Sequence, residues 1–229
     1  TSVMSARPLR LADLERQLLA TRGLAEVSTT GILQRHETVR GASVLVLRAK
    51  HTPIESGVGI NNQGPEYSGP WNGGIQTVMN SPFGYGGRLS ASATLARDID
   101  ELKSYGLSYS QPIGIDGLAA SASIRTTRSK PGFSPAEFDT KTSSISGDLD
   151  VTYPLRLRRG NSLIAGVGFS YLDAAVDLLG EKYTRDRIRT ARASLQYGQI
   201  GFLGGRNSLA VEFIQGLDVL AATDPDRKD

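Results

Sequence analysis

From about residue 54 onward, the chain is a series of short segments in which apolar or small residues alternate with hydroxylic or charged ones. Clear examples are the segments 89–95, 118–124 and 145–151. Because successive side chains of a β-strand point to opposite faces, each segment has one apolar and one polar face. Repeated around a closed sheet, this pattern gives a lipid-facing exterior and a polar lumen, with each strand crossing the bilayer in roughly 9–11 residues. The sequence therefore predicts a membrane all-β protein, an antiparallel transmembrane β-barrel.

The composition narrows the choice of protein class. Hydrophobic residues make up 39% of the 229, and no apolar run reaches about 18 residues, which excludes a transmembrane helix. The 26 Gly and 10 Pro agree with many tight turns, and the lack of Cys excludes disulfides and thiolate metal sites. The net charge of +3 comes from scattered charges of both signs, so nucleic acid is not an expected partner. No signal peptide opens the chain, so we expect that it was removed or that N-terminal sequence is missing.

The first fifty residues have a different pattern. Apolar residues recur at helical spacing over 9–22, and strand-like runs follow over 27–35 and 43–49. This helix–strand–strand order is expected of the C-terminal part of a small α+β domain, which we assign to residues 1–52. About fifty residues are few for an independent hydrophobic core.

We expect nine strands in the remainder, residues 53–229, which would form the N-terminal half of a barrel. Their predicted ranges are 54–62, 70–80, 87–97, 103–111, 117–129, 141–153, 162–175, 184–198 and 207–216. Turn-forming residues occupy 80–86, 112–117, 154–161 and 201–207, whereas 130–140 and 176–183 are predicted as longer, charged loops. Short turns on one rim and longer loops on the other are typical of outer-membrane barrels.

The alternation assigns side chains to faces. A cation on the lipid face near mid-bilayer costs roughly 2–4 kcal/mol, so charged residues should point into the lumen. The residues predicted to face the lumen are Ser144, Ser146, Asp148, Asp150 and Arg192. Trp71, Tyr153, Tyr171 and Tyr197 lie near predicted strand ends, where interfacial aromatic residues occur, although the core of a soluble β-sandwich is an alternative place for them.

Several short motifs, in one order along the chain, carry a family resemblance. They are Leu9–Leu19 with Gly23–Ser28, Val58–Gly64, Tyr67–Trp71, Asn80–Ser90, Tyr105–Gly117, Leu178–Gly180 and Gln215–Asp218. Together they resemble the two-partner secretion transporters, which are haemolysin secretion/activation proteins of the ShlB/FhaC/HecB type in the Omp85 superfamily. In that reading, residues 1–52 resemble the end of a polypeptide-transport-associated (POTRA) domain.

The resemblance implies a function in type V secretion. Such a protein carries two POTRA domains and a sixteen-stranded barrel, so this chain is expected to be a fragment. Its POTRA part would capture an unfolded exoprotein client in the periplasm, and the barrel would translocate it across the outer membrane. The implied client-binding strands contain Val27, Val44 and Val46. Outer-membrane lipid and the barrel assembly machinery are the other implied partners.

No catalytic or cofactor site is predicted. His36 and His51 are the only histidines and have no clustered carboxylates, which makes a metal site a weak hypothesis. The Gly-x-Ser-x-Gly motif of serine hydrolases does not occur. No glycine-rich segment continues into the Lys-Ser/Thr and helix of a phosphate-binding loop. The sequence thus predicts a protein that is not an enzyme and has no cofactor. Two alternatives stay open, namely an Omp85-type outer-membrane protein assembly factor and a soluble all-β binding protein.

Overall fold

The computed structural model describes residues 27–35, 43–64, 69–131, 139–158, 160–201 and 205–223, which contain eleven strands. Two of them, β1 (Val27–Arg35) and β2 (Ser43–His51), pair antiparallel as a separate hairpin. Among these residues, no helix is long and apolar enough to cross a membrane. The helix predicted over 9–22 lies outside the described residues.

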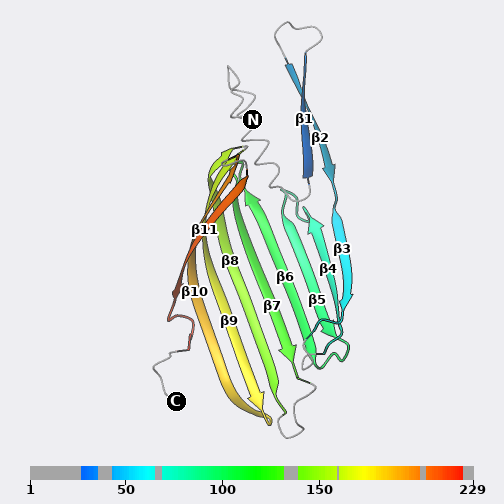
Figure 1. The fold of residues 1–229 in the computed structure, drawn as a ribbon, viewed down its shortest axis with the longest axis vertical. Coiled ribbons are helices and arrows are strands. Elements are labelled where there is room, and N and C mark those ends of the chain that lie inside the picture. Colours follow the sequence, from blue (N-terminus) through cyan, green and yellow to red (C-terminus); the bar gives the residue numbers. More distant parts are fainter. Residues whose placement is uncertain are drawn as a thin grey trace.

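The other nine strands form one antiparallel sheet in which every strand pairs with its neighbours in the chain (Figure 1). They are β3 (Ile54–Asn61), β4 (Asn72–Asn80), β5 (Arg88–Ala96), β6 (Leu102–Ile113), β7 (Leu118–Ser129), β8 (Lys141–Arg158), β9 (Asn161–Leu178), β10 (Glu181–Ile200) and β11 (Arg206–Gly216). All nine predicted strands are therefore present. β3 and β11 are the two edges, as expected of a barrel segment that has not closed on itself.

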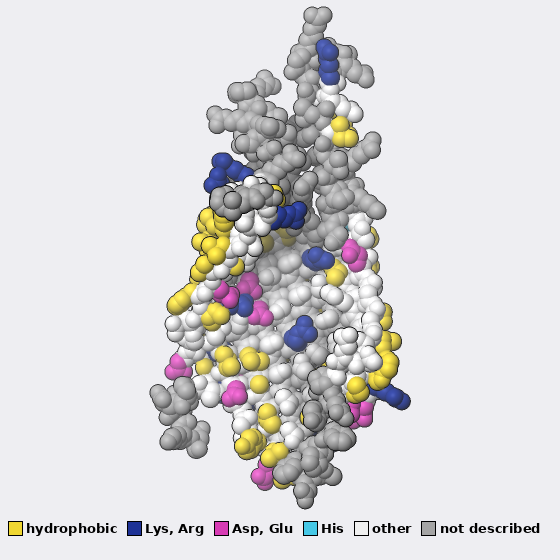
Figure 2. Space-filling view, viewed as in Figure 1, with side chains coloured by type: hydrophobic (Ala, Val, Ile, Leu, Met, Phe, Trp, Pro, Cys, Tyr) yellow, Lys and Arg dark blue, Asp and Glu magenta, His cyan; other side chains and the backbone are white. Residues whose placement is uncertain are grey.

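The pairing register divides the side chains of this sheet between two faces. Val151 pairs with Val167, which pairs with Ala193, so these three side chains share one face. That apolar face carries the odd-numbered residues over most of β4–β6 and β8–β11, and the even-numbered residues of β3 and β7. The opposite, polar face carries mainly Ser, Thr, Gly and charged residues, and Figure 2 is viewed onto it.

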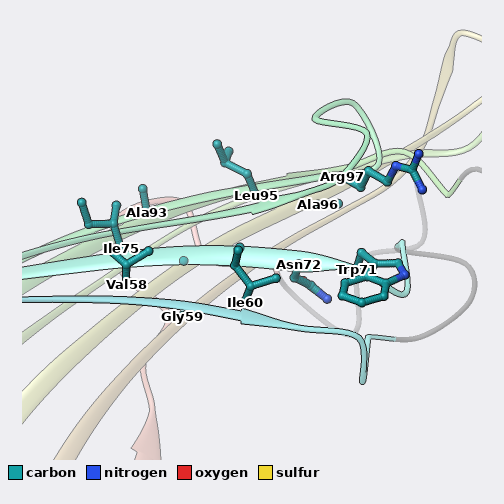
Figure 3. A pocket seen from close by; sticks show the side chains of 12 residues that line it. Val58, Gly59, Ile60, Trp71, Asn72, Ile75, Ala93, Leu95, Ala96 and Arg97 are labelled. Carbon is teal, nitrogen blue, oxygen red and sulfur yellow. The ribbon is translucent and has the colours of Figure 1, made fainter.

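The apolar face has no partner layer among the described residues. Val167 is 61% exposed and Phe213 is 64% exposed, and Val78 and Ala96 are the only buried hydrophobic residues in the described part of the chain. Figure 3 shows side chains of β3–β5 projecting side by side from this face around a shallow apolar groove, which Trp71 lines at one end. An apolar surface of this extent on a single layer requires an apolar environment or a partner.

The width of the apolar face matches a bilayer. On β8 it runs from Ile145 to Tyr153, and on β9 it runs from Leu163 to Tyr171, which is nine residues in each strand. A tilted strand crosses the hydrocarbon layer in about 9–11 residues. Tyr171 and Tyr153 close this band on opposite sides, as interfacial aromatic residues do in membrane barrels.

Two predicted connections are wrong. The predicted turn over 154–161 is mostly strand, because a β-bulge between Pro154 and Arg156 lets β8 continue past a residue without an N–H donor. The predicted loop over 176–183 is also mostly strand. β9 and β10 meet there in a two-residue turn, in which Leu179 (φ 55°) and Gly180 (φ 82°) both have the positive φ of a type I′ hairpin.

One rim of the sheet therefore carries a long paired extension in place of the predicted loop. β9 continues seven residues beyond Tyr171, and β10 accompanies it along that whole length. In a strand that has left the bilayer, neither face needs to be apolar, so a charged sequence is compatible with regular pairing. The charged character of 176–183 therefore reflects where the strands lie and not a loop.

Matched lysine substitutions test the assignment of faces. Val167 and Thr152 lie at nearly the same height on opposite faces, since Val167 pairs with Val151 and Gly166 pairs with Thr152. In the full-length protein, Val167→Lys should reduce the folded, membrane-inserted fraction strongly, at a cost of about 2–4 kcal/mol, whereas Thr152→Lys should insert normally. Heat-modifiable electrophoretic mobility of membrane fractions measures this. Equal behaviour of the two variants would contradict the assignment.

Candidate functional site: the polar face and its charged networks

Charged side chains from two strands meet near the middle of the polar face. The guanidinium Nη2 of Arg192 on β10 lies 2.8 Å from Oδ1 of Asp150 and 3.5 Å from Oδ1 of Asp148, both on β8. Asp148 also accepts hydrogen bonds from Ser170 on β9 (2.7 Å) and Ser123 on β7 (3.2 Å). In the corresponding region of Figure 2, acidic and basic side chains adjoin each other. We call these five residues the wall network.

A glycine allows this network to form across an intervening strand. Asp150 and Arg192 both pair with Gly168 of β9, so their ion pair spans two strand spacings, about 9.6 Å. A Cβ at position 168 would lie 2.2 Å from Asp150 Oδ1 and 3.2 Å from Arg192 Nη2. A larger residue at this position would force the end of the Asp150 side chain to move, so Gly168 leaves room for the contact as it stands.

The wall network borders a polar depression that is lined by more acidic than basic side chains. Glu212 on β11 and Thr152 on β8 line this depression together with Asp150 and Arg192. Two carboxylates, those of Asp150 and Glu212, and one guanidinium therefore line this depression. The wall network is partly open to solvent, with side-chain exposures of 26% for Arg192 and 35% for Asp150. Such a surface is hydrated and can contact a polar or cationic ligand without a large desolvation cost.

The structure brings together three of the five residues predicted to face the lumen. Asp148, Asp150 and Arg192 belong to the wall network, and the unbroken register of β8 puts Ser144 and Ser146 on the same face. Whether this face lines a lumen stays a prediction. Ser123, Ser170 and Gly168 were missed, because only the register between strands shows that they meet the aspartates. The sequence held one indication of this contact, the Gly-x-Gly pattern at 166–168. Both glycines lie at positions that alternation assigns to the polar face, where a missing side chain leaves room for neighbours.

The three valines predicted to bind a client lie in the β1–β2 hairpin. Val44 is 43% exposed, Val46 is partly exposed, and their register partners are Gln34 and Ile32. Ile32, at 39% exposed, therefore shares a face with both valines. Val27 pairs with His51 at the end of the hairpin nearest β3. A role in binding for these residues stays a prediction, as does the domain boundary between residues 52 and 53.

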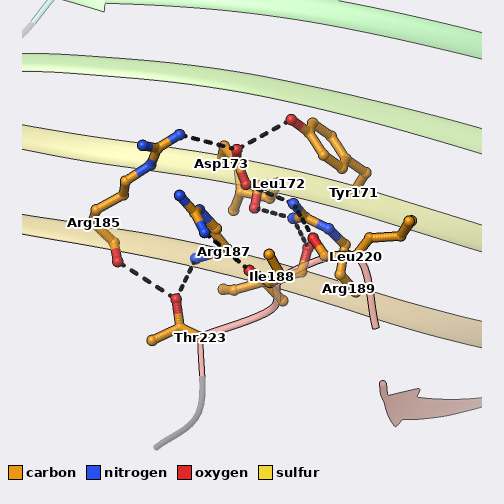
Figure 4. A network of polar contacts seen from close by, with 10 residues as sticks. Tyr171, Leu172, Asp173, Arg185, Arg187, Ile188, Arg189, Leu220 and Thr223 are labelled. Carbon is orange, nitrogen blue, oxygen red and sulfur yellow. Dashed lines mark hydrogen bonds and ion pairs between the residues drawn. The ribbon is translucent and has the colours of Figure 1, made fainter. Parts of the chain in front are cut away.

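A second charged network lies on the other face, beyond the apolar band (Figure 4). Arg189 is only 3% exposed, its Nη2 lies 2.8 Å from Oδ1 of Asp173, and its guanidinium stacks 3.9 Å from the ring centroid of Tyr171. Its Nη1 donates to the carbonyls of Leu172 and Ile188, at 2.9 Å each. The hydroxyl of Tyr171 donates to the other oxygen of Asp173 at 3.1 Å. This network joins β9 and β10 where they leave the apolar band.

The segment after β11 covers this second network. The Leu217 N–H donates to the Arg189 carbonyl, and the Thr223 N–H donates to the Arg187 carbonyl, each at 2.9 Å. Five residues, 218–222, bulge between those two contacts, and the carbonyl of Leu220 accepts from Arg189 at 3.4 Å. The bulge therefore excludes solvent from Arg189, while pairing with β10 resumes at Thr223.

Comparison with known proteins identifies the family. Residues 41–228 match the family described as haemolysin secretion/activation protein ShlB/FhaC/HecB, which covers most of the chain. The chain belongs to this family. Its sheet is thus part of an outer-membrane β-barrel of the two-partner secretion type, as the sequence motifs predicted. A comparison with curated protein sequences finds no match.

Solved structures agree on the fold. CdiB from Escherichia coli is similar over 93% of this chain and 40% of its own, with a TM-score of 0.78 and 17% identity. CdiB from Acinetobacter baumannii is similar over 86% of this chain and 38% of its own, with a TM-score of 0.59 and 16% identity. This chain therefore spans about 40% of the length of these two solved structures.

The second charged network should matter for stability, and a neighbouring arginine supplies the control. Arg189→Met leaves Asp173, whose side chain is 16% exposed, without its close partner. We expect the free energy of unfolding of the full-length barrel to fall by about 2–4 kcal/mol. Arg185→Met removes an exposed arginine that lies 3.7 Å from the same carboxylate, and it should cost less than about 0.5 kcal/mol. Urea unfolding in lipid vesicles measures both, and equal costs would contradict the importance of the buried pair.

Proposed function

We propose that this chain supplies the first part of the pore of an outer-membrane transporter, which exports an unfolded exoprotein to the cell surface. The observation that carries the proposal is the nine-residue apolar band on one face of a single-layer sheet, with a hydrated, charged opposite face. The family match is the second support. Lipid covers the apolar face, and the polar face lines the path of the client. Strands beyond these nine close the barrel, and the barrel assembly machinery inserts it.

The proposal assigns the β1–β2 hairpin to the periplasm, as the end of a POTRA domain. Its strands present backbone N–H and C=O groups at their outer edges, and an extended client can pair with such an edge while its apolar side chains contact Val44 and Val46. The client is thus a secreted polypeptide, recognised by extended conformation and apolar side chains. The proposal involves no catalysis, cofactor or nucleic acid.

The wall network has a function in this proposal. A translocating chain carries charges of both signs, and a wall with partly compensated charges binds neither sign strongly. Arg192 offsets part of the charge of Asp148 and Asp150, which lie on the same face as the row of serines Ser144 and Ser146. A polypeptide can therefore pass without a deep electrostatic minimum.

Export by the full-length protein tests the proposal directly. Val44→Asp should lower the amount of the client exported to the culture medium severalfold, because it places a charge on the apolar contact surface. Arg35→Asp, on the opposite face of the same hairpin, is the control and should leave export near its normal level. Immunoblotting of the medium measures export. A loss of other outer-membrane barrels without a loss of any exported client would favour an assembly factor instead.

Pore selectivity tests the placement of the wall network. Arg192→Gln should increase the preference of the pore for cations, since it leaves Asp148 and Asp150 without their compensating charge. Asp150→Asn should shift the preference toward anions, and Arg185→Gln, outside the polar face, should change nothing. Reversal potentials across planar bilayers under a salt gradient measure these shifts. Identical selectivity in all three variants would contradict a lumenal position.

A further inference from the structure

The apolar face changes character at the rim that carries the turns before β6 and after β7. Lys103 on β6 and Arg128 on β7 are register partners and both lie on the apolar face. The next pair inward on this face is Tyr105 with Thr126, and the next is Leu107 with Ile124. The two cations therefore mark the boundary at which the apolar band ends.

The positive charges of these two side chains are not fully balanced by nearby acidic groups of the described residues. Two like charges directly opposite each other on neighbouring strands destabilise a sheet. Lys103 has one ion pair, at 3.3 Å to Asp100, whose side chain is 76% exposed, and an exposed pair of this kind contributes little. Arg128 is exposed, and within the described part of the chain its side chain has no hydrogen bond or ion pair.

Among the described residues, no acidic side chain forms an ion pair with Arg128. Asp139 accepts from Lys130 at 2.9 Å and from Lys141 at 3.0 Å, and these hydrogen bonds hold the pKa of Asp139 below its usual value. Lys103, Arg128, Lys130 and Lys141 line one depression at this rim, with Asp100 and Asp177 as its only carboxylates from the described residues. The depression therefore has room for an anion and a cationic excess that attracts one.

The position of the pair indicates which anion. Lipid headgroups lie directly outside the hydrocarbon layer, and Lys103 and Arg128 lie directly outside the apolar band on the side that faces lipid. A phosphate there can bridge both side chains, with two parallel hydrogen bonds from the arginine, while its acyl chains lie along Leu107 and Ile124. A soluble anion would gain nothing from the adjacent apolar band.

We propose that Lys103 and Arg128 bind a phosphate group of a lipid headgroup in the leaflet at this rim. The proposal rests on the proposed function, since it requires the apolar face to lie in a membrane. It adds a specific lipid contact to the outer surface of a transporter whose other partner, the client, contacts the inner surface. The bound phosphate would anchor the barrel at a defined height on β6 and β7.

The test is lipid binding by the purified full-length protein in detergent. Bis-phosphorylated lipid A is the probe and phosphatidylcholine is the neutral comparison. The double variant Lys103→Gln/Arg128→Gln should weaken lipid A binding about tenfold without changing phosphatidylcholine binding. The control is Arg156→Gln/Arg158→Gln, which removes two exposed arginines from the apolar face at the opposite rim. It should change lipid A binding less than about twofold.

Other outcomes have definite meanings. Unchanged binding in the Lys103/Arg128 double variant, or an equal loss in the control, would overturn the proposal in favour of general surface attraction. Displacement of lipid A by millimolar inorganic phosphate would overturn it in favour of a soluble anion. Failure of the proposed function is seen separately, as absence of the heat-modifiable folded barrel or of client export in the unsubstituted protein.

Discussion

The lateral ladder of backbone hydrogen bonds is the interaction on which this structure depends. The nine-stranded sheet is a single layer, and among the described residues only Val78 and Ala96 form a buried apolar core. Packing of side chains in an interior therefore cannot hold it together. In a bilayer, an unpaired N–H or C=O group costs several kcal/mol, so strand pairing becomes the main stabilising term. The same ladder sets the register, and the register decides which side chains meet lipid and which meet water.

Much of this architecture was predictable from the sequence. A period of two requires only local information, and every segment with that period, from Ile54 to Gly216, is a strand in the structure. The faces followed from parity for the same reason. The prediction was wrong where the environment along a strand changes. Residues 176–183 are charged because they lie beyond the apolar band, and charge alone cannot distinguish a loop from a strand in water.

The charged networks were less accessible to prediction. Asp148, Asp150 and Arg192 were placed on one face by parity, but their contact depends on pairing between strands that are up to 42 residues apart in sequence. The register also explains why Gly168 lies between them. The pairing of Arg189 with Asp173 was not foreseen, because both residues occupy positions that parity assigns to lipid. They are compatible with that face only because β9 and β10 are longer than the bilayer is thick.

The length of β9 and β10 has a consequence for the space outside the membrane. Seven residues beyond Tyr171 extend about 23 Å along the strand, and the pair ends in a hairpin of only two residues. The Arg189 network and the bulge at 218–222 hold the base of this extension against β11. On this side, the barrel wall therefore continues beyond the apolar band as a hydrogen-bonded hairpin and not as a loop. If the proposed export takes place, a client leaving the pore would be bounded on one side by this hairpin, and its first turns and strands would form away from the membrane surface.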